Sequence, residues 1–238
     1  MTGELDPSVL LLADGRFPAG GHVHSGGMEE AVSRGTVRNT QDLQRFLAGK
    51  LATVGRVDAA LAAMARHLAP TWESLQLLDA EAVARCPSPS LRSASRSQGR
   101  GLSRAGAASW PVARSDPAQA FLGCADGQGP MFPVALGVVG WAAGLESALV
   151  AVVAAQMSIS GAAWASTRLM GLDPYEVVGV ISALGPAVSA VAGDAVRSLP
   201  AVGTAVADAL ATLPSCSATM LDIGAETHAL REVRLFAS

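Results

Sequence analysis

Residues 40–68 read TQDLQRFLAGKLATVGRVDAALAAMARHL, and they carry the clearest helical pattern of the chain. Apolar residues such as Leu43 and Leu47 recur at spacings of three and four, which places them along one face of an α-helix. Thr40 is a residue type typical of an N-cap, and Asp42 in the next turn favours the positive end of the helix dipole. The stretch therefore predicts a long amphipathic helix that begins at Thr40 and packs one face against a core.

The rest of the chain also predicts helices and no sheet. No segment alternates polar and apolar residues as a half-buried strand does, and no βαβ rhythm is present. Residues 105–131 are rich in Ala, Gly, Ser and Pro without periodicity, so we expect a long loop or linker there. We predict an all-α, single-domain helical bundle of about eight to ten helices over residues 1–238. The remaining helices are expected at residues 7–14, 71–86, from Ser88 onward, 132–145, 147–169, 174–193 and 201–213, with a tail that starts helical at Asp222.

Composition limits the classes of function. Half of the residues are apolar but only 4% are aromatic, so small side chains carry the core and helices can approach closely. The formal net charge is −3, which disfavours nucleic acid as a partner because nucleic-acid binders usually carry a basic excess. Cys86, Cys124 and Cys216 are odd in number and far apart without a CxxC, which argues against a disulfide framework or a zinc finger.

We expect a cytoplasmic protein. The N-terminus carries Glu4 and Asp6 and lacks a basic segment before an apolar run, so no signal peptide is indicated. Ser147–Thr167 is uncharged over about the length that crosses a membrane, and a membrane protein built on residues 132–167 is therefore one alternative. Polar residues such as Gln156 interrupt this stretch, which favours a buried helix of a bundle.

One of the expected helices carries a row of arginines. Ser88 followed by Pro89 predicts its start, since proline is tolerated in the first turn of a helix. Four arginines then recur every four residues along one slowly drifting face, which indicates a solvated surface or, alternatively, a contact surface for an acidic partner. They are Arg92, Arg96, Arg100 and Arg104.

His22 and His24 form an HxH pair, a pattern found in metal-dependent amidohydrolases. In those enzymes the pair ends a β-strand and works with further His, Lys and Asp ligands. Here glycines and a proline break the chain before the pair, and only two other histidines exist. We therefore expect no stably bound metal, with His22 and His24 as weak candidates, and we keep a small metal-dependent hydrolase as an alternative. Transient contact with nickel is also open, because imidazole suits that metal.

Residues 15–27 hold five glycines and Pro18, which predicts an ordered loop in place of a helix or strand. The run from Gly20 to Gly27 lacks the pattern of a phosphate-binding P-loop, because the only lysine of the chain is Lys50. Neither a GxSxG elbow nor an evident Cys–His arrangement is present in the sequence. The residues thus indicate a protein that is not an enzyme and that acts through interactions.

Four stretches of the chain resemble the UreF family of urease accessory proteins. ADGRFPAGGHVHSGGME at residues 13–29 resembles the family's opening, in which "AD..FP.GG" is followed by "HSGGLE". LRSASRSQGRGL at residues 91–102 looks like the family's "LR.AS...GR.L" helix, and PVALG at residues 133–137 is similar to its "PVA.G". The tail, residues 221–238, carries LDI, a histidine and RLFAS, similar to "LDI…H…RLF.S". Together the matches span nearly the whole chain.

This resemblance implies an all-α protein, commonly a homodimer, that does no chemistry itself. It implies binding to a scaffold accessory protein, UreD (also called UreH), and to a nickel-carrying GTPase, UreG, in an assembly that inserts nickel into apo-urease. The chain is then expected to be an adaptor that regulates the GTPase, while nickel is handled by the complex and not held stably here. Whether GTP hydrolysis is stimulated or restrained is left open.

The resemblance also assigns residues to partners. Those expected on the face that meets the GTPase are Glu29, Asp79 and Arg168. Arg168 is expected to pair by charge more than to act as a catalytic arginine finger. Without a partner, Glu29 would simply be a carboxylate in the first turn of a helix, where it favours the dipole.

The tail and the glycine-rich loop receive the remaining roles. The residues expected to bind the scaffold protein are Arg234, Leu235 and Phe236, although the two apolar ones would suit core packing as well. The residues expected to shape the loop that presents the Glu29 carboxylate are His24, Ser25, Gly26 and Gly27.

The chain departs from the family pattern at three places. Residues 168–174 read RLMGLDP where the family often has "R..PLGQ", which leaves the contact made at residues 171–174 in question. His22 stands where an aromatic residue is common. Glu30 adds a second acidic residue directly after Glu29.

Overall fold

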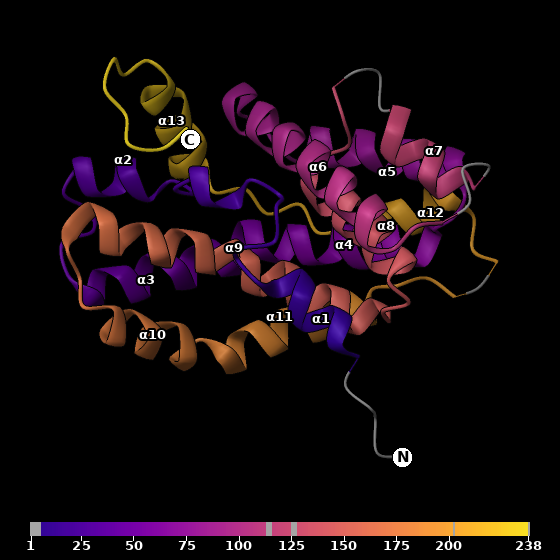
Figure 1. The fold of residues 1–238 in the computed structure, drawn as a ribbon, viewed down its shortest axis with the longest axis horizontal. Helices are drawn as coiled ribbons and strands as arrows, with labels where there is room; N and C mark the ends of the chain where they lie inside the picture. Colours follow the sequence, from indigo (N-terminus) through magenta and orange to yellow (C-terminus); the bar gives the residue numbers. More distant parts are fainter. Residues whose placement is uncertain (1–5, 113–115, 125–127, 202, 238) are drawn as a thin grey trace.

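The computed structural model describes residues 6–112, 116–124, 128–201 and 203–237, and Figure 1 shows them as a set of packed helices. Within these ranges the chain forms helices and turns but no strand, so the predicted all-α class is confirmed. The α-helices are α1 (Pro7–Ala13), α2 (Met28–Ser33), α3 (Thr40–Lys50), α4 (Arg56–Leu68), α5 (Trp72–Ala84), α6 (Pro89–Ser109), α7 (Pro117–Cys124), α8 (Phe132–Ala142), α9 (Ser147–Met170), α10 (Pro174–Ala183), α11 (Gly185–Arg197), α12 (Val206–Ala211) and α13 (Thr219–Ala229), with a 3₁₀ turn at Gly21–Val23.

One helical rod spans residues 40–68 as the sequence predicts, but it contains a π-helical turn. α3 continues through Leu51–Gly55 into α4 with helical dihedral angles on both sides of the junction. The N-cap is Asn39 and not the predicted Thr40, because the Asn39 side chain accepts a hydrogen bond from the Asp42 amide at 2.9 Å. Asn is at least as good an N-cap as Thr, so the helix begins with the stronger of two adjacent candidates.

The loop predicted at residues 105–131 is wrong for much of its length. α6 continues to Ser109, and Pro117–Cys124 forms α7. The small residues that suggested a loop are sites of close packing, since a methyl group at Gly106 would overlap the Val139 side chain of α8. Tertiary packing therefore overrides the weak helix propensity of this composition. Residues 113–115 and 125–127 lie outside the described residues.

Two other predicted helices are divided or shortened. The helix expected at residues 174–193 is two helices, α10 and α11, which meet at Leu184 with a bend of 43°. Pro186 lies in the first turn of α11 and has no N–H to donate to the preceding turn, which explains the break. The helix expected at residues 201–213 is reduced to α12, Val206–Ala211.

The centre of the bundle is α4, which packs against both α8 and α9. Every residue from Ala59 to Ala65 is buried, and most of these residues are alanine. A methyl group at Gly137 of α8 would overlap the carbonyl oxygen of Ala62, and one at Gly140 would overlap Val150 of α9. Small residues on α4 and α8 therefore let three helix backbones approach more closely than larger side chains would allow.

α9 is long and apolar enough to cross a membrane by length and composition, and the bent pair α10–α11 passes the same test. Half of the most apolar window of α9 is buried inside the fold, where the helix packs against α4, α11 and α2. The core helix of a helical bundle passes the same test, so the length and composition of α9 are weak evidence for a membrane span.

The close approach of α8 to α4 predicts the effect of a single added methyl group. Gly137→Ala should lower the free energy of unfolding by about 1–3 kcal/mol, because the methyl group meets backbone that cannot move aside. Gly161→Ala on α9 is the matched control: no atom lies within 4 Å of the added methyl, so stability should rise by up to about 1 kcal/mol. Urea denaturation measures both, and equal midpoints for Gly137→Ala and the unchanged chain would contradict this packing.

Candidate functional site

The glycine-rich loop ends by starting α2, and this start places Glu29. Gly26 and Gly27 adopt positive φ angles of 59° and 90°, a left-handed conformation that favours glycine, so the chain turns sharply here. The buried Ser25 hydroxyl oxygen accepts a hydrogen bond from the Glu29 amide at 3.3 Å and so caps the new helix. Ser25, Gly26 and Gly27, which with His24 are predicted to shape the loop, form the turn that leads into α2, and Glu29 lies in the first turn of that helix.

The Glu29 carboxylate points toward the C-terminal tail and binds it at three points. Its oxygens accept hydrogen bonds from the Leu235 amide at 2.7 Å and the Phe236 amide at 3.0 Å. His228 Nε2 of α13 lies 2.8 Å from Glu29 Oε2. The Glu29 side chain is only 12% exposed, and the His228 side chain 4%. We call these four residues the tail anchor.

The protonation of Glu29 is tuned by these contacts. Burial alone would raise the pKa of the Glu29 carboxyl. The hydrogen bonds from the Leu235 amide, from His228 and from the Phe236 amide outweigh this and hold its pKa below the usual 4.5. The carboxylate is therefore ionised at neutral pH, and its charge is used inside the chain to bind the tail.

Arg168 joins the same site from the last turn of α9. Its guanidinium lies 4.8 Å from the centre of the Phe236 ring, which is the geometry of a cation–π contact. Phe236 is 5% exposed, and the next residue, Ala237, donates an amide hydrogen bond to the Val23 carbonyl at 2.7 Å. The structure thus brings together residues that the sequence assigned to two partners, since Glu29 and Arg168 both contact Phe236.

Arginines also fasten α13 to α2 beside the tail anchor. The buried Glu30 carboxylate pairs with Arg34 at 2.6 Å and with Arg231 at 2.7 Å. Arg231 donates a further hydrogen bond to the Ser33 hydroxyl at 2.6 Å, and Arg34 donates one to Thr227 at 3.0 Å. Figure 1 shows α13 and the C-terminus beside α2, as these contacts require. Glu30, a departure from the family pattern, is thus part of this junction.

Asp79 lies elsewhere, on α5, and is 9% exposed. Its carboxylate pairs with Arg96 at 2.7 Å and accepts a hydrogen bond from the Met131 amide at 2.7 Å. The structure gives Asp79 an internal role that holds the start of α8, and its predicted contact with the GTPase stays a prediction.

The row of arginines on α6 is mostly engaged within the chain. Arg92 donates hydrogen bonds to the carbonyls of Cys86 and Pro87 at 2.7 and 2.8 Å. Arg100 donates one to the Gln128 carbonyl, while Arg104 is exposed. A single shared surface, solvated or acidic-binding, is therefore the wrong interpretation for the row, because its members serve different neighbours.

The HxH pair is split between two environments. His22 is exposed, whereas His24 is half-buried, and burial together with the nearby His22 lowers the pKa of His24. Among the described residues, no group of three or more His, Cys, Asp or Glu side chains is placed to hold a metal ion. The two histidines therefore lack a third such side chain around them in the described ranges.

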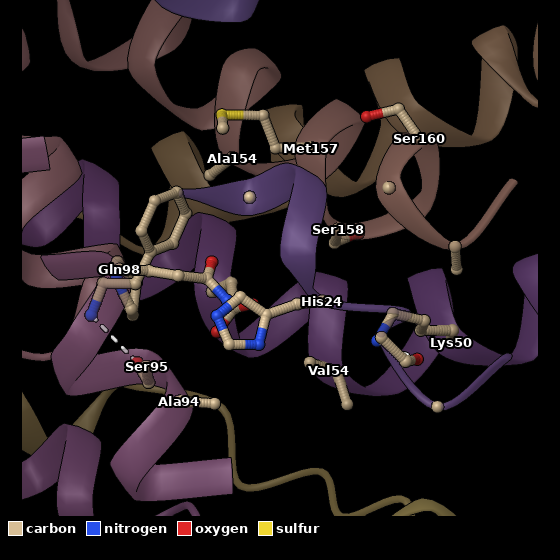
Figure 2. A pocket seen from close by; sticks show the side chains of 18 of the residues that line it. His24, Lys50, Val54, Ala94, Ser95, Gln98, Ala154, Met157, Ser158 and Ser160 are labelled. Atoms are coloured by element: carbon tan, nitrogen blue, oxygen red, sulfur yellow. Dashed lines mark hydrogen bonds between the residues drawn. The ribbon is translucent and has the colours of Figure 1, made fainter. Parts of the chain in front are cut away.

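A cavity of about 770 Å³ lies behind the glycine-rich loop. Its walls include the loop, the π-helical turn and parts of α4, α6, α8 and α9. In the view of Figure 2 the His24 ring lies among the lining side chains, with Lys50 to one side and Gln98 to the other. Asp58 of α4, Arg168 of α9 and Phe236 of the tail anchor also line the cavity, so it reaches from α4 to the tail.

Lys50 and Asp58 are two of the charged residues that line this cavity. The Lys50 ammonium donates a hydrogen bond to the Gly26 carbonyl at 3.0 Å. Within the part of the chain that the structure describes, the Asp58 carboxylate has no hydrogen-bond partner and no ion-pair partner within 4.0 Å. Burial raises the pKa of Asp58 to about 6, although the Lys50 charge opposes the shift. A carboxylate kept in this setting costs stability at neutral pH.

Sequence reasoning missed three residues of this region: His228, Lys50 and Asp58. His228 is separated from Glu29 by 199 positions, and a lone histidine in a helix carries no local sign of its partner. Lys50 did stand out as the only lysine of the chain. Nothing in the sequence distinguishes Asp58 from other aspartates, because its raised pKa and its lack of a hydrogen-bond partner among the described residues arise only from its place in the folded chain.

Comparison with known proteins supports a family for this fold and site. The UreF family model matches residues 37–185, which is more than half of the chain. The chain is 39% identical over 231 residues to a urease accessory protein UreF of Mycolicibacterium vanbaalenii, covering 97% of this chain and 98% of the relative. It is 40% identical over 232 residues to a Mycobacterium marinum protein of that name, covering 97% of each. The chain belongs to the UreF family.

This UreF-family chain also exposes apolar side chains around its anchored tail. Leu230 is 86% exposed, Val233 88% and Leu235 52%, and Met220 and Ile223 of α13 are exposed as well. We call these five residues the outer tail patch. Phe236 points inward against Arg168 while the outer tail patch faces outward, so the anchored tail presents an apolar surface beside the exposed Arg234.

Removing the Glu29 charge should release the tail. In Glu29→Gln the amide cannot accept from all three donors, so trypsin should cleave after Arg234 about tenfold faster than in the unchanged chain. The Glu29 pKa is lowered by folding, so tail binding is complete above pH 4.5 and is lost as the pH falls through the lower folded value. Intact-mass spectrometry measures the cleavage, and an unchanged rate in Glu29→Gln would contradict the tail anchor.

Asp58 should destabilise the fold at neutral pH. Its folded pKa of about 6 lies above the unfolded 3.8, so the chain loses stability as the pH rises between these values. Asp58→Asn removes that loss, so it should match the unchanged chain near pH 4 and exceed its stability by up to about 3 kcal/mol above pH 7, the upper limit for this partly buried side chain. Asp208→Asn, which removes a carboxylate at an exposed position, is the matched control and should change the midpoint of urea denaturation little. A constant difference between Asp58→Asn and the unchanged chain across this range would refute the assignment.

Proposed function

We propose that this chain is an adaptor in the maturation of urease. In this role it links the scaffold accessory protein UreD/UreH to the nickel-carrying GTPase UreG and regulates that GTPase while nickel is inserted into apo-urease. Membership in a family named for urease accessory proteins supports a role beside the enzyme in place of catalysis. The working form is proposed to be a cytoplasmic homodimer that uses neither nucleic acid nor a membrane.

The observation that carries this proposal is the anchored tail. Glu29 fixes the backbone of the tail at Leu235 and Phe236, while the side chains of Val233 and Leu235 remain exposed. A segment already held in one conformation loses less entropy on binding, which favours its use as a docking element. We assign the scaffold partner to the outer tail patch together with Arg234, while Phe236 secures the tail from inside.

The surface for the GTPase is proposed at the end of α9. Arg168 is an exposed residue whose guanidinium lies over Phe236, so a partner bound at Arg168 would respond to whether the tail is in place. In this proposal Glu29 contributes indirectly to the GTPase surface by binding the tail, and Asp79 contributes indirectly by fixing the start of α8. Gly171, Asp173 and Pro174 form the turn after α9 where the family often has another motif, and they cap α9 and α10 in its place.

Nickel is proposed to be held by the assembled complex and not stably by this chain. His22 is exposed next to the tail anchor's loop and is the better placed of the two histidines for a transient contact. The alternative of a metal-dependent hydrolase gains no support from the geometry of the pair, since its two rings lie in different environments.

Co-purification tests the adaptor role. The full chain, UreD/UreH and UreG from one source should elute together on size exclusion with nickel and a GTP analogue. Val233→Asp should weaken binding of the scaffold protein at least about tenfold, because it places a charge in the outer tail patch without touching the tail anchor. Leu77→Asp, at an exposed apolar position on α5, is the matched control and should bind normally.

Each outcome decides one part of the proposal. Normal binding by Val233→Asp would move the docking surface away from the tail while keeping the adaptor. Failure of the unchanged chain to bind either accessory protein would overturn the adaptor function itself.

A further inference from the structure

Lys50 reaches from the rod of α3 to the backbone of the glycine-rich loop. Its ammonium donates to the Gly26 carbonyl at 3.0 Å, a contact between residues 24 positions apart. Gly26 has a φ of 59°, and a methyl group added there would lie 3.3 Å from Lys50 Nζ. The loop therefore turns tightly against the lysine head group, and the lysine holds the turn from the cavity side.

The same turn leads directly into α2, which carries Glu29. Gly27 is the N-cap residue of α2, and Glu29 follows two positions later in the first turn. Ser25, directly before Gly26, caps the Glu29 amide, while a methyl group at Gly27 would lie 3.0 Å from Leu221 of α13. A shift of the Gly26 peptide thus moves the start of α2 and, with it, the carboxylate that binds the tail.

The lysine itself is suited to a positioning contact. It is the only lysine among the 17 Lys and Arg residues, it lies directly before the π-helical turn, and it lines the cavity together with Gly26. π-helical turns of this kind concentrate at functional sites. Burial lowers the pKa of Lys50, and the negative charge of Asp58 on the same rod opposes this, which favours the ammonium form that donates the stronger hydrogen bond.

We propose that Lys50 is a positioning residue for the C-terminal tail: by holding the Gly26 carbonyl it keeps Glu29 aligned with the Leu235 and Phe236 amides. The cavity and the tail are thereby coupled, although the hydrogen bond of Lys50 goes to Gly26 and not to a residue of the tail anchor. Any group that draws the ammonium away from Gly26 loosens the tail without contacting it.

Tryptic release of the tail from the isolated full-length chain tests this inference. In Lys50→Met, which keeps the length of the arm but lacks the donor, cleavage after Arg234 should be about fivefold faster than in the unchanged chain. Lys50→Arg keeps a donor, and the cavity has room for its larger head, so its rate should stay within about twofold. Arg56→Met removes an exposed cation from the same rod that pairs with Asp194 of α11 and not with the loop, and it should behave like the unchanged chain.

A second measurement separates positioning from general loss of stability. Hydrogen exchange of the α9 amides should be the same in Lys50→Met and the unchanged chain while tail cleavage accelerates. Equal tail cleavage in the two would overturn the inference, and so would a parallel rise of tail cleavage and α9 exchange, which would make Lys50 a purely structural residue. No partner protein takes part, so these outcomes are independent of the proposed adaptor function.

Discussion

The close approach of α4 to α8 and α9 is the constraint on which the rest of the molecule depends. Alanines on α4 and glycines on α8 leave no room for larger side chains at the contacts, as at Gly137 and Ala62. α9 packs along α4 and α8, and its last turn brings Arg168 to the tail. The rod that contains α4 also carries Lys50 and Asp58 to the cavity, so the core positions both the site and its support.

The tail anchor holds the C-terminal tail against the core so that the outer tail patch faces solvent. The Glu29 carboxylate accepts two backbone amides of the tail and contacts His228, so the segment's shape is set by a charge at the start of α2. Hydrogen bonds to an ionised group are stronger than those between neutral groups, which suits the anchoring of a short terminal segment. Residues that the resemblance assigns to two different partners thus form one structural unit. A substitution at Arg168 or Glu29 removes a contact that holds the tail.

The fold class could be predicted from the sequence because helical periodicity is local, as in the stripe that includes Leu43 and Leu47. The start at Ser88 and Pro89 was predictable for the same reason. The helices at residues 105–109 and 117–124 were not, because their small residues favour a helix only when neighbours such as Val139 pack against them. The site was partly predictable: the motifs named Glu29, Arg168 and Phe236, but His228 and Lys50 join them only through contacts distant in sequence.

Hydrogen exchange at the tail amides of the isolated full-length chain tests the central claim most directly. The amides of Leu235 and Phe236 should be protected at neutral pH relative to the amide of Val233, and their protection should disappear as the pH falls below 4.5 through the lowered pKa of Glu29. Exchange of all three amides at the same unprotected rate at neutral pH would show that the Glu29 carboxylate does not hold the tail, and the account built on it would be wrong.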